Sequence, residues 1–153
     1  MKIYCDLDGV LVDFNKGYLE LTGKDISNNF INDPSFWEPI NEEGIMFWVR
    51  LGWMEDGHIL WDYIKKYNPI ILSAPSQDPS SRYGKKYWVR QNISKSTQLI
   101  LADAKTKPLY SGLDKILIDD REDTIKKCNK NKGIGILHKS ASKTIKKLKE
   151  LGL

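Results

Sequence analysis

The sequence predicts an α/β fold: a Rossmann-like parallel sheet core with helices on both faces and a small helical cap inserted after the first strand. Three observations support this prediction. Short apolar runs alternate with helical patterns, β-branched and aliphatic residues dominate those runs, and one long segment without strands interrupts the alternation near the N-terminus. Apolar runs of this kind are typical of strands that are buried on both faces of a parallel sheet.

Five apolar runs form the predicted strands. They span residues 2–5, 69–72, 98–101, 115–118 and 134–137. The helical patterns span residues 58–67, 83–91, 122–129 and 142–151. We expect Ser140 or Ser142 to cap the last helix, which Gly152 follows. Since strands and helices alternate, the strands are expected to run parallel in one sheet.

Residues 14–57 form the segment that breaks the alternation. This segment is longer than a single crossover helix requires, so we interpret it as a helical cap over one end of the sheet. Residues 1–13 and 58–153 would then form the core domain. The predicted cap contains eight aromatic residues: Phe14, Tyr18, Phe30, Phe36, Trp37, Phe47, Trp48 and Trp53.

The composition predicts a cytoplasmic protein with one compact domain. The chain has 153 residues, of which 41% are hydrophobic, and this is enough for a stable core. No run of about 18 apolar residues predicts a membrane span, and Asp6 comes too early for a signal peptide. Cys5 and Cys128 are too few for a disulfide framework. We expect a monomer or a homodimer without a membrane partner.

The net charge of +4 is unevenly distributed, because lysines are dense between Lys126 and Lys149. In the last helix the lysines lie opposite an apolar side that contains Ile145 and Leu148. A solvated helix face is the favoured interpretation. Attraction of nucleic acid is the alternative, although no aromatic residues interleave with these lysines.

Polar residues follow four of the predicted strands. In an open parallel sheet, ligands bind beyond the carboxyl ends of the strands, so these residues are expected to share one region. The residues that follow the successive strands are Asp6, Asp8 and Gly9; Ser73, Ala74 and Pro75; Asp103 and Lys105; and Asp119, Asp120 and Arg121.

Two acidic pairs carry the predicted chemistry. Asp6 and Asp8 suit a divalent cation, or a division of roles between a nucleophile and a proton donor. The structural alternative is an Asx turn with a helix cap. The adjacent acids Asp119 and Asp120 repel each other, and a bound cation removes that repulsion. Their structural alternative is to cap the helix that begins near Glu122.

Ser73, Ala74 and Lys105 are the predicted phosphate-binding residues. A phosphate requires hydrogen-bond donors and a cation. The Ser73 hydroxyl and the Ala74 N–H would supply the donors, and Lys105 would supply the charge. Lys107, only two residues further along, is a rival for the same role.

These residues, in this order, resemble the four motifs of the haloacid dehalogenase-like phosphatase superfamily. The motifs are the segment from Asp6 to Leu11, then Ser73, Lys105 and the Asp119–Asp120 pair. Within the superfamily, the chain is most similar to the 5′(3′)-deoxyribonucleotidases. That finer resemblance rests on residues 8–14, 36–37, 71–75, 86–89 and 118–121.

The resemblance implies a role for each of these residues. Asp6 would attack phosphorus and form an aspartyl-phosphate, while Asp8 would protonate the leaving oxygen and then activate water. Mg²⁺ would be held by Asp6, by the backbone carbonyl of Asp8, and by Asp119 or Asp120. Ser73 and Lys105 would bind the phosphate oxygens, and the cap would select the substrate.

Two departures from the family pattern are visible. The position after Ser73 often carries a second hydroxyl in the family, but here it is Ala74, which can offer only its N–H. The lysine also lies somewhat farther upstream of the paired acids than the family pattern predicts. Both Lys105 and Lys107 therefore stay open as the phosphate lysine, with Lys105 preferred.

We expect the substrate to be a small phosphate monoester, specifically a (deoxy)nucleoside 5′-monophosphate. Phe14, Trp37, Phe47 and Trp48 are the candidates for stacking on its base. The alternative is that most cap aromatics form the cap's own core, because a short insertion must bury apolar surface. Two other functions stay open: a polynucleotide 3′-phosphatase, and a non-catalytic phosphate-binding protein on the same scaffold.

Overall fold

The computed structural model describes residues 1–26 and 32–153. Its centre is a five-stranded parallel sheet with the strand order β3-β2-β1-β4-β5. The strands are β1 (Lys2–Cys5), β2 (Ile70–Ser73), β3 (Leu99–Leu101), β4 (Lys115–Asp119) and β5 (Ile134–Leu137). The α/β prediction is therefore confirmed, and each strand lies within one residue of its predicted bounds.

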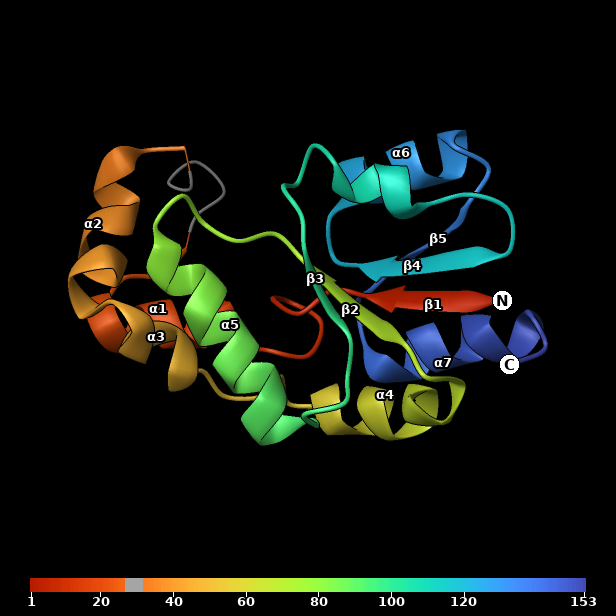
Figure 1. Ribbon diagram of the computed structural model, residues 1–153, viewed down its shortest axis with the longest axis horizontal. Coiled ribbons are helices and arrows are strands. Elements are labelled where there is room, and N and C mark those ends of the chain that lie inside the picture. Colours follow the sequence, from red (N-terminus) through yellow and green to blue (C-terminus); the bar gives the residue numbers. More distant parts are fainter. Residues whose placement is uncertain (27–31) are drawn as a thin grey trace.

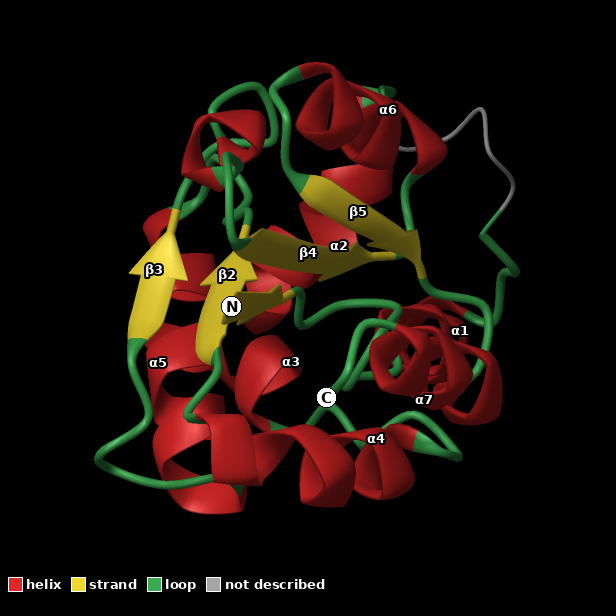
Figure 2. Ribbon diagram, turned by 90° about the vertical axis from the view of Figure 1, so that its right-hand side faces the viewer, coloured by secondary structure: helices red, strands yellow, loops and turns green. Residues whose placement is uncertain are grey.

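Helices cover both faces of the sheet. The helices are α1 (Phe14–Thr22), α2 (Pro34–Glu43), α3 (Ile45–Val49), α4 (Gly57–Ile64), α5 (Pro79–Asn92), α6 (Glu122–Lys130) and α7 (Ala141–Glu150), with 3-10 turns η1 (Lys65–Tyr67) and η2 (Lys107–Tyr110). Helix α6 lies on one face, and α4 and α7 lie side by side on the other (Figure 2). No helix within residues 1–26 and 32–153 is long and apolar enough to cross a bilayer.

Capping side chains set where the helices begin. Ser140, rather than Ser142, caps α7, because its hydroxyl accepts a hydrogen bond from the Lys143 N–H at 3.3 Å. Helix α5 begins at Pro79, four residues before its predicted start. There Asp78 accepts from the Ser80 N–H at 2.9 Å, and proline suits the first turn. The sequence pattern predicted the helix, and the N-cap residue Asp78 places its start earlier than the pattern did.

Within the described part of residues 14–57, the regular elements before α4 are the helices α1, α2 and α3, as expected for a helical insertion. Helices α1, α2 and α3 gather with α5 beyond the carboxyl ends of the strands (Figure 1). Its aromatic residues pack mainly against one another: the rings of Tyr18 and Phe36 stack at 4.2 Å. Phe30 lies outside the described residues. The division into cap and core domains stays a prediction.

Helix α3 packs closely on α5 at Gly84, so we expect Gly84→Ala to destabilise the protein. An added Cβ would lie 2.3 Å from the Cβ of Trp48 and 3.3 Å from the Ile45 carbonyl oxygen. Overpacking of this kind costs about 1–3 kcal/mol of unfolding free energy. Urea titration measures the change. Gly52→Ala is the matched control, because nothing lies within 4 Å of its added Cβ. Equal losses in both variants would contradict this packing.

Candidate active site

The site lies where the strand order of the sheet reverses. From β1 the chain passes to β2 and β3 on one side, then returns to β4 and β5 on the other. Such a switch point opens a crevice beyond the carboxyl ends of the strands. Asp6 directly follows β1, and Asp119 ends β4 beside it, since the Asp6 N–H donates to the Ile118 carbonyl at 2.9 Å. The topology therefore brings the two predicted acidic motifs together.

The loop after β1 folds tightly back on itself. The Leu7 carbonyl accepts hydrogen bonds from the N–H groups of Leu11 and Val12, each at 2.9 Å. Gly9 has a φ of 76° in this turn. An added Cβ there would lie 2.1 Å from Oδ2 of Asp120. Glycine is thus needed both for the positive φ and for the close approach of the Asp120 carboxylate.

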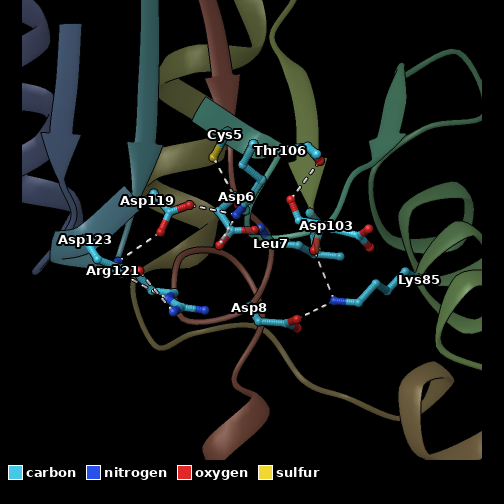
Figure 3. Close-up of polar contacts among 12 residues, drawn as sticks. Cys5, Asp6, Leu7, Asp8, Lys85, Asp103, Thr106, Asp119, Arg121 and Asp123 are labelled. Carbon is cyan, nitrogen blue, oxygen red and sulfur yellow. Dashed lines mark hydrogen bonds and ion pairs between the residues drawn. The ribbon is translucent and has the colours of Figure 1, made fainter. Parts of the chain in front are cut away.

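Three carboxylates converge in this crevice. Asp6, Asp119 and Asp120 each offer one oxygen, and these oxygens all lie within 4.8 Å of one another. Asp6 and Asp119 are buried, and Figure 3 shows their side chains approaching each other from adjacent strands. The buried Lys107 bridges them: its Nζ lies 2.8 Å from Oδ2 of Asp6 and 2.7 Å from Oδ2 of Asp119.

The pKa shifts show that one lysine does not balance these acids. Burial alone would lower the pKa of Lys107, but Asp6 and Asp119 outweigh it and raise that pKa, so the lysine stays charged. Burial, then the charge of Asp6, raises the pKa of Asp119. Burial and the charges of Asp6 and Asp119 raise the pKa of Asp120 to about 7. Negative charge in the cluster therefore exceeds what Lys107 neutralises.

The cluster fits a hard divalent cation such as Mg²⁺. Its donors are carboxylate oxygens, which are the ligands that this ion prefers. The two Asp119 oxygens already accept hydrogen bonds, from Lys107 and from the Arg121 N–H at 2.9 Å. Asp120 has no ion-pair partner among the described residues. Of the adjacent pair, Asp120 is therefore the one whose charge most needs a cation.

A second buried lysine, Lys85, stands on the other side of the crevice. Its Nζ forms an ion pair with Oδ2 of Asp8 (Figure 3). This Nζ also donates to the Ser73 hydroxyl at 3.0 Å. The same Nζ lies 5.0 Å from the ring centre of Trp48, within reach of a cation–π contact. Oδ1 of Asp8 is buried and has no hydrogen-bond partner among the described residues. Asp8 and Ser73, from two different strand ends, are thus joined by one cation.

The geometry favours Lys107 over Lys105 as the phosphate lysine. Lys105 is exposed, whereas Lys107 is only 2% exposed and lies among the carboxylates. The reason is local: the Asp103 carbonyl accepts from the N–H groups of Thr106 and Lys107, at 2.8 and 3.0 Å. This turn carries Lys105 outward and directs Lys107 into the crevice. Ala74 is partly buried directly after Ser73, so its N–H stays a predicted phosphate donor.

Two of the four predicted stacking residues are buried. Phe47 and Trp48 are only 5% and 2% exposed, so their rings do not offer an open face to a base. They are buried because the insertion forms its own core: Phe14 lies 5.5 Å from Phe47 and 5.7 Å from Trp48, between ring centres. Phe14 and Trp37 are partly buried, and their substrate role stays a prediction.

Lys85 is the site residue that sequence reasoning missed, although a signal was present. The buried face of α5 contains Ser81, Gly84, Lys85 and Trp88. A lysine at three- and four-residue spacing from small and aromatic residues lies on the apolar face of a helix. Buried lysines are rare unless they are paired, so such a lysine predicts an acidic partner. The sequence pattern could not identify that partner as Asp8.

We expect Mg²⁺ to stabilise the protein more at pH 8 than at pH 5. Without a metal, the folded state keeps the Asp120 proton up to about pH 7, whereas the unfolded chain loses it near pH 3.8. The Asp120 contribution to stability therefore falls as the pH rises between these values. Mg²⁺ competes with that proton, so its binding is strongest where Asp120 is ionised.

The measurement is the shift in melting temperature on adding Mg²⁺ after EDTA treatment, at both pH values. Asp120→Asn should remove most of the shift at pH 8, because it removes the carboxylate without changing the side-chain size. Asp103→Asn, at an exposed strand-end acid, is the control. Equal shifts at pH 5 and pH 8, or an unaltered shift in Asp120→Asn, would contradict a metal role for this residue.

Comparisons with known proteins support the fold. No protein-family model matches it, and no curated protein matches its sequence. Among solved structures, a putative β-phosphoglucomutase from Thermotoga maritima has a TM-score of 0.57 at 12% identity, covering 99% of this chain and 100% of that one. A hydrolase from Streptococcus pneumoniae has a TM-score of 0.55 at 13% identity, covering 99% and 98%.

A HAD-superfamily hydrolase from Ehrlichia chaffeensis extends the same likeness, with a TM-score of 0.50 at 10% identity over 99% of this chain and 97% of that one. These identities are low, so the similarity concerns the arrangement of strands and helices. The finer likeness to deoxyribonucleotidases receives no support from these structures. At the level of its architecture, the chain has the fold of the HAD-superfamily hydrolases.

Proposed function

We propose that this protein is a Mg²⁺-dependent phosphatase that acts through an aspartyl-phosphate on Asp6. The observation that carries the proposal is the convergence of Asp6, Asp119 and Asp120 around Lys107 in a crevice at the carboxyl edge of the sheet. Phosphoryl transfer requires positioning and charge neutralisation above all. Two buried acids and one exposed acid, with Lys107 beside them, supply groups for both.

Asp6 is the proposed nucleophile. Its Oδ1 accepts from the Leu7 N–H at 2.8 Å and its Oδ2 lies 2.8 Å from Nζ of Lys107, so the carboxylate is fixed in position. Attack on phosphorus forms a bond to an Asp6 oxygen and breaks the bond to the ester oxygen. A carboxylate nucleophile thereby divides one difficult hydrolysis into two easier steps.

Asp8 is the proposed acid and base. In the first step it would donate a proton to the leaving ester oxygen; in the second it would take a proton from the water that attacks the aspartyl-phosphate. Acid–base assistance of this kind contributes about 10²–10⁴-fold. Inorganic phosphate leaves and Asp6 is regenerated. The Asp8 side chain is 29% exposed, so substrate and water can reach it.

The proposed metal ligands are Asp6, Asp120 and the backbone carbonyl of Asp8, with Asp119 completing the cluster. Mg²⁺ bound there would neutralise charge on the transferring phosphoryl group. Ser73, the Ala74 N–H, Lys85 and Lys107 are the proposed phosphate-binding groups. Ser73 is fully buried at the end of β2, and the contact with Lys85 at 3.0 Å aligns the two.

We expect Lys85→Met to lower kcat/KM about 10–100-fold, because it removes one charged donor to the phosphate and frees Asp8. Phosphate release from the best substrate measures the effect. Methionine keeps the length of the buried side chain, and Lys86→Met, at the exposed neighbour, is the control. If both variants behave like the parent chain, Lys85 has a structural role only.

The proposed substrate is a (deoxy)nucleoside 5′-monophosphate. Support comes from the partly buried rings of Phe14 and Trp37 in the insertion beyond the strand ends, whose centres lie 6.1 Å apart. A base contacting such rings gains about 1–3 kcal/mol. Phe47 and Trp48 are buried, so the proposed base contacts are limited to Phe14 and Trp37.

The decisive experiment is a panel of phosphate esters assayed with Mg²⁺ and with EDTA. It should contain deoxynucleoside and ribonucleoside 5′-monophosphates, a phosphoglucose, and an oligonucleotide with a 3′-phosphate. Preference for mononucleotides supports the proposal. Equally weak activity on nucleotides and the sugar phosphate contradicts the nucleotide claim. Release only from the oligonucleotide indicates a polynucleotide 3′-phosphatase, and no Mg²⁺-dependent release indicates a non-catalytic phosphate-binding protein.

A further inference from the structure

A basic hollow lies between the open edge of the sheet and helix α7, apart from the carboxylate cluster. Strand β5 is one of the two edge strands of the sheet. The hollow beside it has a volume of about 300 Å³, and its lining consists of Leu137, Lys139, Lys143, Lys146, Lys147 and Glu150. Four lysines therefore face one concave space that contains a single acid. The proposed phosphatase chemistry uses none of them.

These lysines are not neutralised by the protein. None of the four has an ion-pair partner within 4.0 Å among residues 1–26 and 32–153. By comparison, Lys65 and Lys126 elsewhere on the surface each lie within reach of an acid on their own helix or turn. Positive charges that gather around one hollow repel each other, and a bound polyanion would relieve that repulsion.

The helix directs these lysines outward because its apolar side is occupied. Leu148 is fully buried, and Ile145 and Leu151 pack against the main core. Lys143, Lys146 and Lys147 are consequently left on its polar side, where Lys146 and Lys147 are adjacent and follow Lys143 by about one helical turn, roughly 5.4 Å along the axis. The hollow thus gathers four positive charges, which complement the charge of an anionic polymer.

We propose that this hollow binds the phosphodiester backbone of a single-stranded nucleic acid. A membrane surface fits less well, because interfacial helices bury an apolar face in the lipid and the apolar side of α7 is already buried in the protein. A backbone that runs through a basic groove is the usual mode of single-strand binding. The inference stands whether or not the carboxylate cluster hydrolyses phosphate esters.

One end of the hollow lies near the carboxyl ends of the β-strands, where the carboxylate cluster is located. Lys139 follows His138, whose N–H donates to the Asp119 carbonyl at 2.9 Å. Leu137 is the register partner of Asp119. A nucleic acid bound along α7 would therefore approach the carboxyl ends of the β-strands next to β5. The basic hollow and the carboxylate cluster are therefore neighbours at the carboxyl ends of the β-strands.

The test is binding of the full chain to a fluorescent single-stranded oligonucleotide, measured by anisotropy in EDTA so that no turnover occurs. We expect Lys143→Gln/Lys147→Gln to weaken binding about tenfold at low salt. The slope of log affinity against log salt should shrink by about 1.4, since each lost phosphate contact contributes about 0.7 for a single strand. Lys139→Gln/Lys146→Gln is a second, independent variant and should behave alike.

Lys95→Gln/Lys126→Gln removes the same charge away from the hollow and is the matched control. The proposal is overturned if this control weakens binding as much as the hollow variants, or if the parent chain does not bind the oligonucleotide at low salt. It is also overturned if vesicles containing phosphatidylserine, and not the oligonucleotide, bind in a manner that depends on Lys143 and Lys147. Turnover of a small phosphate ester should be unchanged in every hollow variant, which separates this result from the phosphatase proposal.

Discussion

Replacing Asp6 by asparagine should reduce turnover of the preferred phosphate ester by about 10⁴-fold or more. An amide cannot form the acyl phosphate, and the crevice offers no second carboxylate in the same position. Asp119 is held by Lys107 and by the Arg121 N–H, and Asp8 is held by Lys85. Asp120 is a proposed metal ligand, so none of these three carboxylates is free to replace the nucleophile.

The Asp6→Asn variant should keep its fold. The ion pair between Lys107 and Asp119 at 2.7 Å survives the change, and the repulsion between Asp6 and Asp119 disappears. Circular dichroism and the urea midpoint check this, while phosphate release measures turnover. Asp103→Asn, at the exposed acid after β3, is the control and should be fully active. If Asp6→Asn retains even a tenth of the parental rate, Asp6 is not the nucleophile.

The sequence predicted the sheet and the acid positions because both depend on local rules. Runs such as Ile70–Ser73 are buried on both faces, so their composition alone marks them as strands. Once the strands are known to be parallel, the residues that follow them must share one edge of the sheet. Asp6 and Asp119 are therefore placed together by topology, without knowledge of any side-chain contact.

The two lysines of the site could not be assigned in this way. Lys107 enters the crevice because the chain makes a turn after Asp103 that leads directly into η2. The sequence alone does not show whether that turn directs Lys105 or Lys107 inward. Lys85 comes from the interior of α5, twelve residues beyond Ser73, and meets it only through tertiary packing. The rule that functional residues follow the ends of parallel strands cannot predict a site residue that lies within a helix.

The aromatic residues show a further limit of composition. Phe47 and Trp48 were predicted to contact substrate because an aromatic-rich insertion suggests base stacking. A short helical insertion must also bury its own apolar surface, and in this fold that requirement determines the position of both rings. Whether these rings contact substrate or are buried depends on the close packing of α3 against Gly84. The residue pattern does not show that packing.

Replacing Lys107 by methionine should impair both stability and catalysis. The change leaves Asp6 and Asp119 buried without their shared cation, and removing one partner of a buried ion pair costs about 3–5 kcal/mol of unfolding free energy. It also removes a charge beside the proposed nucleophile, so kcat/KM should fall about 10²–10³-fold. Urea unfolding and phosphate release measure the two effects separately.

Lys105→Met is the matched control, since the side chain is exposed and lies two residues away. It should leave stability and turnover unchanged. Lys107→Met/Asp119→Asn should be less destabilised than the sum of the two single variants, because the second change removes one of the carboxylates that the first leaves unpaired. Strict additivity would show that the contact at 2.7 Å contributes no coupling energy. If Lys105→Met abolishes turnover while Lys107→Met does not, then Lys105 is the phosphate lysine and the arrangement proposed around Lys107 is wrong.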